Sequence, residues 1–476
     1  MQKQLKSIIG VVLVTAIGIV IGIAKPWIPE LSEQGHSVIM VLLIAIGLWV
    51  FKPFQLPFSM GAVFLTGSLL ILGIPFSQAF AGFTSAAVWT LIPSLFFGYV
   101  VAKTGLGKRI ALLLLKQFKP TIFGMTLTFL LIGLVLSMLT PAIVVRISIM
   151  LPIAISCLEV CKIKGDSPTG SLVLLTVWAT ALMPGNAWLT GSLWGPILQG
   201  MYDAVPELSG VVNFNSWLQA AFVPLVIQSV ILLFGGFLFL RPKEKVDISI
   251  TKEDFAKQYK ELGRMTSPEI YSALILVLSF IVFLLGGLGL HSIPESAVVL
   301  VATFLLALTG VIKVNEISTG INWDLVIFVG TALGLGAVFA GTGISEWISS
   351  ILLELLAPIG DNYWILFFSI LLILFLWRFF DIALMLPTLS IFIPTLPAIS
   401  QRFGINPLVW IPIFVMASNC FFMSYTNVFA LFGQSVNGSR GWTQSQISRY
   451  GIVYGIACII TLALSIPYWS SIKFLF

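Results

Sequence analysis

Long runs of apolar residues follow one another along the chain, separated by short polar segments. About 20 helical residues suffice to cross the hydrocarbon core of a bilayer, and most of these runs are close to that length. They cover approximately residues 8–24, 37–51, 57–74, 84–102, 121–160, 168–200, 214–240, 268–290, 294–312, 321–341, 363–400, 406–436 and 446–472. The pattern predicts an all-α polytopic membrane protein with about eleven spans.

Two of the runs are too long for one crossing. Run 121–160 is broken near its middle by Pro141, because proline lacks an N–H and clashes with the preceding turn. Run 363–400 has a similar length, and several apolar residues match when Pro152 is set against Pro387. We therefore predict two re-entrant hairpins in corresponding positions.

The second half of the chain repeats the plan of the first. Matching landmarks lie at nearly constant offsets, which are 237 for Pro57 and Pro294, 238 for Thr104 and Thr342, 235 for Pro152 and Pro387, and 241 for Asn186 and Asn427. Each repeat holds five spans and one hairpin, and an odd number of spans inverts the second repeat across the membrane. We predict an N-terminal transmembrane helix at 1–36, a first repeat at 37–240, a cytosolic linker at 241–267 and an inverted second repeat at 268–476.

Basic residues indicate how the chain is oriented. Lys3 and Lys6 precede the first span, and the loops that alternate onto the same side carry most of the Lys and Arg residues. The positive-inside rule places the N-terminus in the cytoplasm and the C-terminus outside a cytoplasmic membrane. The net charge of +6 belongs to these loops and does not indicate binding to nucleic acid.

The composition of the chain excludes several classes of protein. Hydrophobic residues make up 58% of the chain and charged residues 9%, whereas a soluble domain carries roughly 25% charged residues. The four cysteines have no metal-ligand spacing, and the chain has two histidines. We therefore expect no metal site, no cofactor and no enzymatic activity.

Polar residues at two interruptions of the apolar runs are candidates for substrate binding. Run 168–200 is broken at 183–186 and run 406–436 at 424–427. Broken helices at mid-membrane expose backbone groups that transporters use to bind ions and substrates. Alternatively, the polar residues there only cap the fractured helices. Their matched positions favour binding, and the predicted ligands are Asn186, Thr190, Ser424, Thr426 and Asn427.

Three charged residues fall inside the predicted hairpins. A charge within a span costs roughly 2.5–3.5 kcal/mol on insertion scales, so Arg146, Arg378 and Asp381 should face a cavity or a partner. The repeat alignment sets Arg146 opposite Asp381, six residues before each proline. We predict a structural ion pair between these two, which leaves Arg378 to attract the substrate. In the alternative, Asp381 pairs with Arg378 and Arg146 is the anion ligand.

Several motifs resemble the divalent anion/sodium symporter family. They are the segment 261–269 before a span, Asn322-Trp323-Asp324, Gly341-Thr342-Gly343 and the segment 383–387. The resemblance covers nearly the whole chain. It implies a homodimer in the lipid bilayer that carries dicarboxylates, tricarboxylates or sulfate by an elevator motion, often coupled to sodium.

The chain departs from that family at both hairpin tips, so it is identified as an atypical member. The family carries a Ser-Asn-Thr triplet ten residues before each proline, whereas this chain has Ala142-Ile143-Val144 and Trp377-Arg378-Phe379. Thr140, Pro141 and Arg146 resemble a subgroup typified by oxoglutarate/malate-type carriers, which adds Thr140 and Arg146 to the predicted substrate-binding residues. Without the triplet oxygens we expect no strict dependence on sodium.

Three classes of function are open to such a chain. A secondary active transporter of small anions is favoured by the repeat and by the intramembrane arginines, whose guanidinium groups suit oxyanions. A cation/proton antiporter on the same scaffold would use Asp381 as the proton-bearing residue. A membrane enzyme or lipid-handling protein would need a catalytic constellation, and the sequence offers none.

Overall fold

Helix follows the apolar runs of the chain, because a backbone inside a bilayer has to satisfy its N–H and C=O groups internally. The structure is a computed structural model, and it describes residues 2–240, 249–381, 384–438 and 441–476. The helices up to the linker are α1 (Gln2–Ala24), α2 (Glu33–Phe51), α3 (Phe58–Ile71), α4 (Phe76–Ala79), α5 (Ala86–Lys103), α6 (Leu106–Leu115), α7 (Ile122–Leu139), α8 (Ile143–Val160), α9 (Pro168–Leu182), α10 (Trp194–Asp203), α11 (Phe214–Trp217) and α12 (Val223–Leu240). Those that follow are α13 (Ser249–Glu261), α14 (Ser267–Gly287), α15 (Glu295–Leu308), α16 (Trp323–Thr342), α17 (Ile344–Gly360), α18 (Tyr363–Trp377), α19 (Leu386–Phe392), α20 (Leu396–Phe403), α21 (Trp410–Ser418), α22 (Val428–Asn437) and α23 (Gln444–Ser471).

Ten helices within the described residues are long and apolar enough to cross a membrane. Four more apolar helical segments are shorter, namely Phe58–Ile71, Glu295–Leu308, Tyr363–Trp377 and Pro407–Ser418. Each predicted apolar run is helical over most of its length. The prediction of an all-α polytopic membrane protein is therefore confirmed.

The two predicted hairpins differ in detail. In the first, α7 and α8 are joined by a short turn at residues 140–142, directly at Pro141, and Pro152 lies inside α8. In the second, α18 ends at Trp377, and Pro387 stands in the first turn of α19. Residues 382–383 of the predicted second hairpin, 241–248 of the predicted linker and 439–440 lie outside the described residues.

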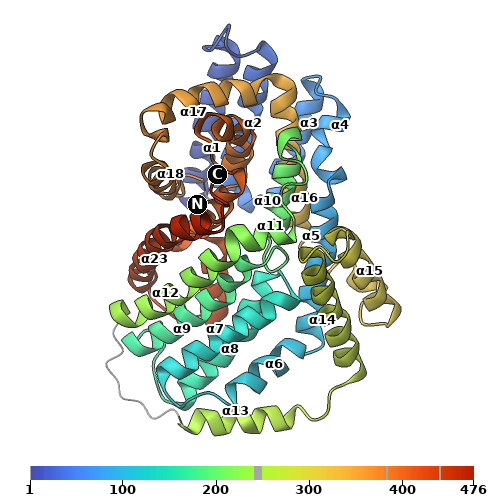
Figure 1. The fold of residues 1–476 in the computed structure, drawn as a ribbon, viewed down its shortest axis with the longest axis vertical. Helices are drawn as coiled ribbons and strands as arrows, with labels where there is room; N and C mark the ends of the chain where they lie inside the picture. The colour runs from blue at the N-terminus through green and yellow to red at the C-terminus, as the bar shows by residue number, and fades with distance from the viewer. Residues whose placement is uncertain (1, 241–248, 382–383, 439–440) are drawn as a thin grey trace.

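Helix boundaries recur at the spacing that the sequence predicts. Helices α3 and α15 begin 237 residues apart, as do α5 and α16, and α6 and α17 begin 238 residues apart. Helices α13 and α17 lie at opposite ends of the long axis of the molecule (Figure 1). The inverted relation of the two halves and the domain boundaries stay predictions.

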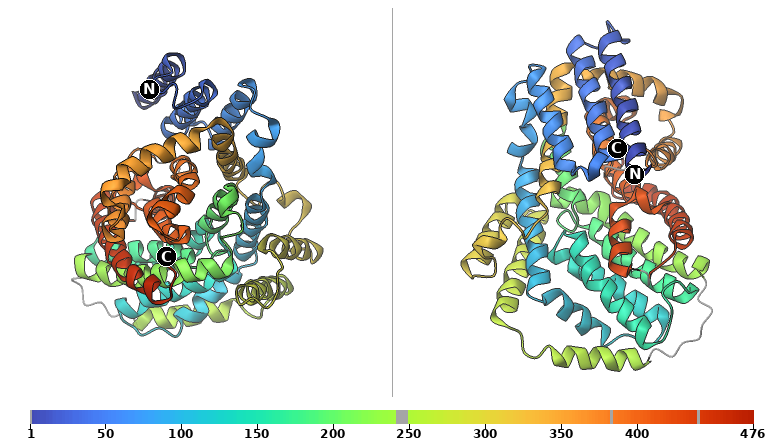
Figure 2. Two further views of the ribbon diagram at one scale, coloured as in Figure 1. Left: turned by 45° about the horizontal axis from the view of Figure 1, so that its top comes forward. Right: turned by 180° about the vertical axis from the view of Figure 1, so that it is seen from behind.

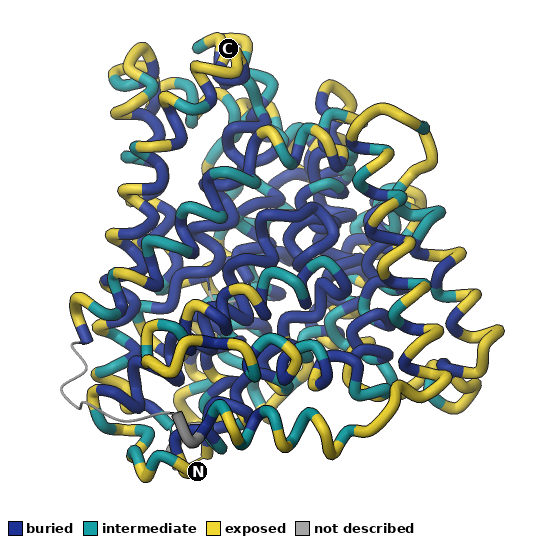
Figure 3. The backbone as a smooth tube through the Cα atoms, turned by 60° about the horizontal axis from the view of Figure 1, so that its bottom comes forward, coloured by how far each residue is buried: buried dark blue, intermediate teal, exposed yellow. Residues whose placement is uncertain are grey.

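The broken helix of the first half lies at the centre of the molecule. The window that includes α9 and the turn after it is 100% buried, more than any other candidate span. Around it, the backbone is buried in the middle and exposed at the periphery (Figure 3). Helices α1, α2 and α3 pack together on one outer side (Figure 2). A polar group on the first broken helix is thus shielded from solvent and lipid.

One buried arginine, Arg109 of α6, connects the segment 261–269 to the membrane-spanning helices. Arg109 of α6 donates from Nε to Glu269 Oε1 at 2.9 Å and from Nη1 to the carbonyl of Gly263 at 3.0 Å. Glu269 in turn completes a capping box with Thr266 at the start of α14. The segment 261–269 therefore serves as an anchor between the linker and α14.

Candidate functional site

Arg146 is fully buried at the start of α8, just after the turn of the first hairpin. Its Nε donates to the carbonyl of Ala181 at 2.7 Å, and its Nη1 donates to the carbonyls of Thr140 at 2.9 Å and Gly191 at 2.6 Å. Its Nη2 has no hydrogen-bond partner among the described residues. The guanidinium is therefore fixed by carbonyl groups that carry no net charge, and one nitrogen stays available.

The segment that interrupts the first broken helix wraps around this guanidinium. Helix α9 ends at Leu182, and a single 3-10 turn, Pro184–Ala187, follows. A Cβ atom on Gly185 would lie 2.6 Å from Arg146 Nη2 and 2.4 Å from the carbonyl oxygen of Gly191. Only glycine admits the guanidinium at this distance. The interruption and the hairpin turn thus form one polar cluster.

Polar side chains of the same segment are buried without partners. Asn186 is fully buried, and within the described residues neither its Oδ1 nor its Nδ2 has a hydrogen-bond partner. The same holds for Thr190 Oγ1 and for the indole nitrogen of Trp188. Buried polar groups normally have partners, so these open groups are candidates for contact with a ligand. The sequence reasoning missed Trp188, although an indole two residues after Asn186 inside the interruption was a usable signal.

Thr140 has a local role in addition to its carbonyl bond with Arg146. Its Oγ1 accepts from the N–H of Ala142 at 3.0 Å, and the side chain is 1% exposed. This bond shapes the turn of the first hairpin, so Thr140 contributes to the cluster chiefly through its backbone oxygen.

The second hairpin holds its charges differently. Arg378 is fully buried at the end of α18, and its Nη1 donates to the carbonyl of Asp381. Its Nε and Nη2 have no partner within the described part of the chain. The Asp381 carboxylate accepts from the hydroxyl of Thr388.

The predicted ion pair between Arg146 and Asp381 is not formed in this structure. The three salt bridges within the described residues join Lys25 to Glu33, Lys103 to Glu316 and Arg109 to Glu269. The repeat alignment that suggested this pair stays a prediction. In the structure, Arg146 donates to carbonyls of the first half of the chain and the Asp381 carboxylate accepts from Thr388 of the second half. Asp381 and Arg378 are linked through the Asp381 backbone, close to the alternative that the sequence left open.

The polar residues of the second broken helix are engaged in local bonds. Asn427 Oδ1 accepts from the N–H groups of Phe429 and Ala430, and its Nδ2 donates to the carbonyl of Asn419 at 3.0 Å. Thr426 Oγ1 donates to the carbonyl of Met423. Ser424 Oγ donates to Gln444 and accepts from Gln434. Here the helix-capping alternative describes the contacts better than ligand binding.

The two broken helices lie side by side. The indole nitrogen of Trp178 in α9 donates to the carbonyl of Phe429 at 2.9 Å, and that of Trp194 in α10 donates to Asn419 Oδ1 at 3.2 Å. The structure thus brings the two interruptions together through tryptophans that the sequence did not single out.

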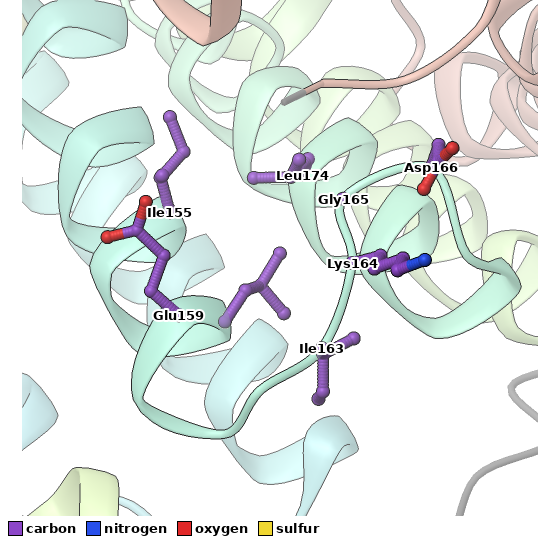
Figure 4. A pocket seen from close by; sticks show the side chains of 8 residues that line it. Ile155, Glu159, Ile163, Lys164, Gly165, Asp166 and Leu174 are labelled. Atoms are coloured by element: carbon purple, nitrogen blue, oxygen red, sulfur yellow. The ribbon is translucent and has the colours of Figure 1, made fainter. Parts of the chain in front are cut away.

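Two cavities adjoin the two ends of α8. One of about 380 Å³ lies against the first hairpin turn and is lined in part by residues 141–145 and Leu193. The other, of about 330 Å³, lies between the ends of α8 and α9, with Glu159, Lys164 and Asp166 on its wall (Figure 4). No predicted site residue lines the second cavity, whereas the first borders the turn that leads to Arg146.

Known proteins resemble this chain along most of its length. A family model described as the sodium:sulfate symporter transmembrane region matches residues 5–475. The chloroplastic dicarboxylate transporter 1 of Arabidopsis thaliana is 25% identical over 337 residues, which are 69% of this chain and 59% of that protein. The inner membrane protein YbhI of Escherichia coli is 25% identical over 393 residues, 79% of each chain.

Among solved structures, the YdaH transporter of Alcanivorax borkumensis superposes with a TM-score of 0.54 at 10% identity, covering 86% of this chain and 90% of that one. At this identity the likeness shows the fold alone. The family match extends over nearly the whole chain, so the resemblance that the sequence motifs suggested is confirmed.

Proposed function

We infer that this chain, which belongs to the sodium:sulfate symporter family, is a secondary active transporter that carries a small dianion across the membrane. A dicarboxylate is the proposed substrate, because the plant relative is named a dicarboxylate transporter. The relatives do not favour a cation/proton antiporter built on Asp381. An enzymatic role gains no support from the relatives either.

This proposal rests on Arg146 and Asn186, which are fully buried and have polar atoms without hydrogen-bond partners among the described residues. A buried guanidinium needs an anionic partner to offset the cost of its desolvation. The recorded partners of Arg146 are carbonyls, which leave its charge uncompensated. With Asn186 and Thr190 open beside it, a carboxylate of the substrate would find a charge-assisted bond and further donors in one place.

The residues at the first hairpin turn also indicate whether transport is coupled to sodium. Ala142, Ile143 and Val144 stand where the family places side-chain oxygens, and all three line the cavity of about 380 Å³. Sodium is a hard cation that prefers oxygen ligands, and these side chains offer none. We therefore propose transport without a strict requirement for sodium.

The larger arrangement is proposed on the same family basis. The chain would work as a homodimer in the cytoplasmic membrane, with its N-terminus inside and its C-terminus outside. The two hairpins and the two broken helices would move together as the substrate-carrying part of an elevator.

Uptake into liposomes tests the function. Purified protein is reconstituted in vesicles loaded with unlabelled dicarboxylate, and the uptake of labelled dicarboxylate, sulfate and a monocarboxylate is followed in sodium and in choline buffer. We expect dicarboxylate uptake in both buffers, weaker uptake of the monocarboxylate, and loss of uptake in Asn186→Ala. Uptake that vanishes in choline and saturates with sodium would contradict the sodium-independent mechanism.

A further inference from the structure

The cavity beside the first hairpin lies between parts of both repeats. Its walls include Tyr99 of α5, the turn residues 141–145 and the segment 319–322 that leads into α16. A Cβ atom on Gly320 would lie 3.3 Å from Tyr99 Cγ. The Tyr99 ring is therefore packed against this segment.

An ion pair lies next to two of the lining residues, Tyr99 and Gly320, although neither of its members lines the cavity itself. Lys103 stands one helical turn beyond Tyr99, and its Nζ is 5.7 Å from the centre of the Tyr99 ring. The same Nζ lies 2.6 Å from Glu316 Oε2. Glu316 in turn accepts from the N–H of Gly320 through its carbonyl at 2.7 Å. The pair is thus connected to both walls.

Glu316 is held as an ionised carboxylate. Its Oε2 also accepts from the N–H of Lys313 at 2.8 Å. The Lys103 ammonium, followed by this N–H, lowers the pKa of Glu316 to about 2. An unperturbed glutamate has a pKa of about 4.3, so Glu316 would stay ionised at neutral pH without Lys103 and would leave a full negative charge beside Gly320.

We propose that this cavity is the vestibule through which the dianion reaches the first hairpin turn, and that Lys103 and Glu316 set the charge of its mouth. The inference rests on the proposed function and extends it to residues outside the central cluster. The vestibule faces the side that the basic loops predict to be cytosolic. The side chains of Lys103 and Glu316 are 28% and 15% exposed, so their charges act on an approaching solute and are screened by salt.

The sign of each charge gives a distinctive test. Lys103→Met leaves Glu316 uncompensated and repels a dianion, whereas Glu316→Gln leaves Lys103 uncompensated and attracts it. Glutamine retains an oxygen that can accept from Lys313. Charges at the rim of a binding site change mainly the rate at which a charged substrate associates. We therefore expect opposite shifts in KM, each roughly threefold to tenfold at low ionic strength. The double variant should return close to the wild-type KM.

The measurement is uptake of labelled succinate into inside-out membrane vesicles, which present the predicted cytosolic face to the medium, at low and high salt. Lys103→Arg keeps the charge and should resemble the wild type. Lys25→Met, which removes the ion pair with Glu33, is the control for a pair away from the cavity. High salt should diminish both shifts.

Shifts of KM in the same direction for Lys103→Met and Glu316→Gln would overturn the inference. An ion pair with a purely structural role affects transport in the same way whichever of its two partners is removed. Equal KM values accompanied by reduced folded yield would overturn it as well. A wild type that carries neither succinate nor another dianion of the panel would instead refute the proposed function on which the inference rests.

Discussion

In the first broken helix Asn186 is fully buried, and both polar atoms of its amide lack partners among the described residues. In the second, Asn427 is 2% exposed and uses both atoms, Oδ1 to accept from two N–H groups at the start of α22 and Nδ2 to donate to Asn419. The two residues are of one type, and the sequence predicts matched positions for them. In the structure Asn427 caps a helix, whereas the open amide of Asn186 is the group that the proposed function assigns to a ligand.

The hairpin arginines differ in a parallel way. Arg146 is fixed by three carbonyls from three separate segments, whereas for Arg378 the bond to the Asp381 carbonyl is the one that the structure describes. The sequence alignment sets Arg146 opposite Asp381 and not opposite Arg378, so the two arginines do not occupy equivalent positions. Under the proposed function, substrate binding falls mainly to the first half of the chain.

The largest effect is expected from removing the arginines one at a time. Arg146→Met leaves three buried carbonyls unpaired, and each costs about 1–3 kcal/mol. Arg378→Met removes the donor of one described carbonyl, that of Asp381. It should therefore lower the free energy of unfolding less than Arg146→Met does. Denaturation in detergent measures both variants, and Arg146→Lys, which keeps the charge, serves as the control for transport. Equal destabilisation by the two methionine variants would remove the distinction between the hairpins.

Gly185→Ala tests the close packing of the first cluster. The added methyl group would lie 2.4 Å from the carbonyl of Gly191 and 2.6 Å from Arg146 Nη2, so the guanidinium has to move, at a cost of about 1–3 kcal/mol. We expect dicarboxylate uptake to fall at least tenfold, on the order of that cost. Gly67→Ala, where a Cβ meets nothing within 4 Å, is the matched control. Normal uptake by Gly185→Ala would mean that the guanidinium position is not critical.

The two asparagines should respond oppositely to alanine. Asn427→Ala removes a helix cap and should lower the free energy of unfolding by about 0.5–2 kcal/mol, while each folded molecule still transports. Asn186→Ala removes no recorded bond, so stability should change little and uptake should be lost. Specific activity per folded molecule, with thermal unfolding beside it, measures the two effects. The reverse assignment would show that the binding half is the second repeat.

The smallest effects are expected at the hydroxyl groups. Thr426→Val removes the bond to the carbonyl of Met423 and should cost about 0.5–1.5 kcal/mol of stability without changing KM. Thr190→Val removes an open hydroxyl and should raise KM for the dicarboxylate without lowering stability. Concentration series in liposomes give KM for both. A KM shift in Thr426→Val alone would place a substrate contact in the second repeat.

The sequence predicted the architecture because that depends on the pattern of apolar and polar residues. The runs, the break at Pro141 and the interruptions after α9 and α21 all occur where the hydrophobic pattern changes. The sequence could not predict which polar atoms would be paired. Asn427 directly precedes a helix, whereas Asn186 lies within a 3-10 turn with Trp194 as the first residue of the next helix. Asn427 therefore caps a helix that begins at the next residue, whereas no helix begins close enough to Asn186 for the same bond.

The predicted ion pair fails for a related reason. Sequence alignment gives equivalence between Arg146 and Asp381, but a hydrogen bond depends on the local fold of each tip. Gly185 and Gly191 leave room for the Arg146 guanidinium, whose Nη1 donates to the carbonyl of Gly191 in the same half of the chain. The two glycines are visible in the sequence, yet their facing positions follow from the tertiary structure.

The most direct test of the account is equilibrium binding of a labelled dicarboxylate to purified protein in sodium-free buffer, compared between Asn186→Asp and Asn427→Asp. Asp caps a helix about as well as Asn, so Asn427→Asp should bind with the wild-type Kd per folded molecule. Asn186→Asp places a carboxylate in the segment around Arg146, where it competes with the substrate, and binding should be lost. Loss of binding in Asn427→Asp with an unchanged Kd in Asn186→Asp would contradict the assignment of the site to the first repeat.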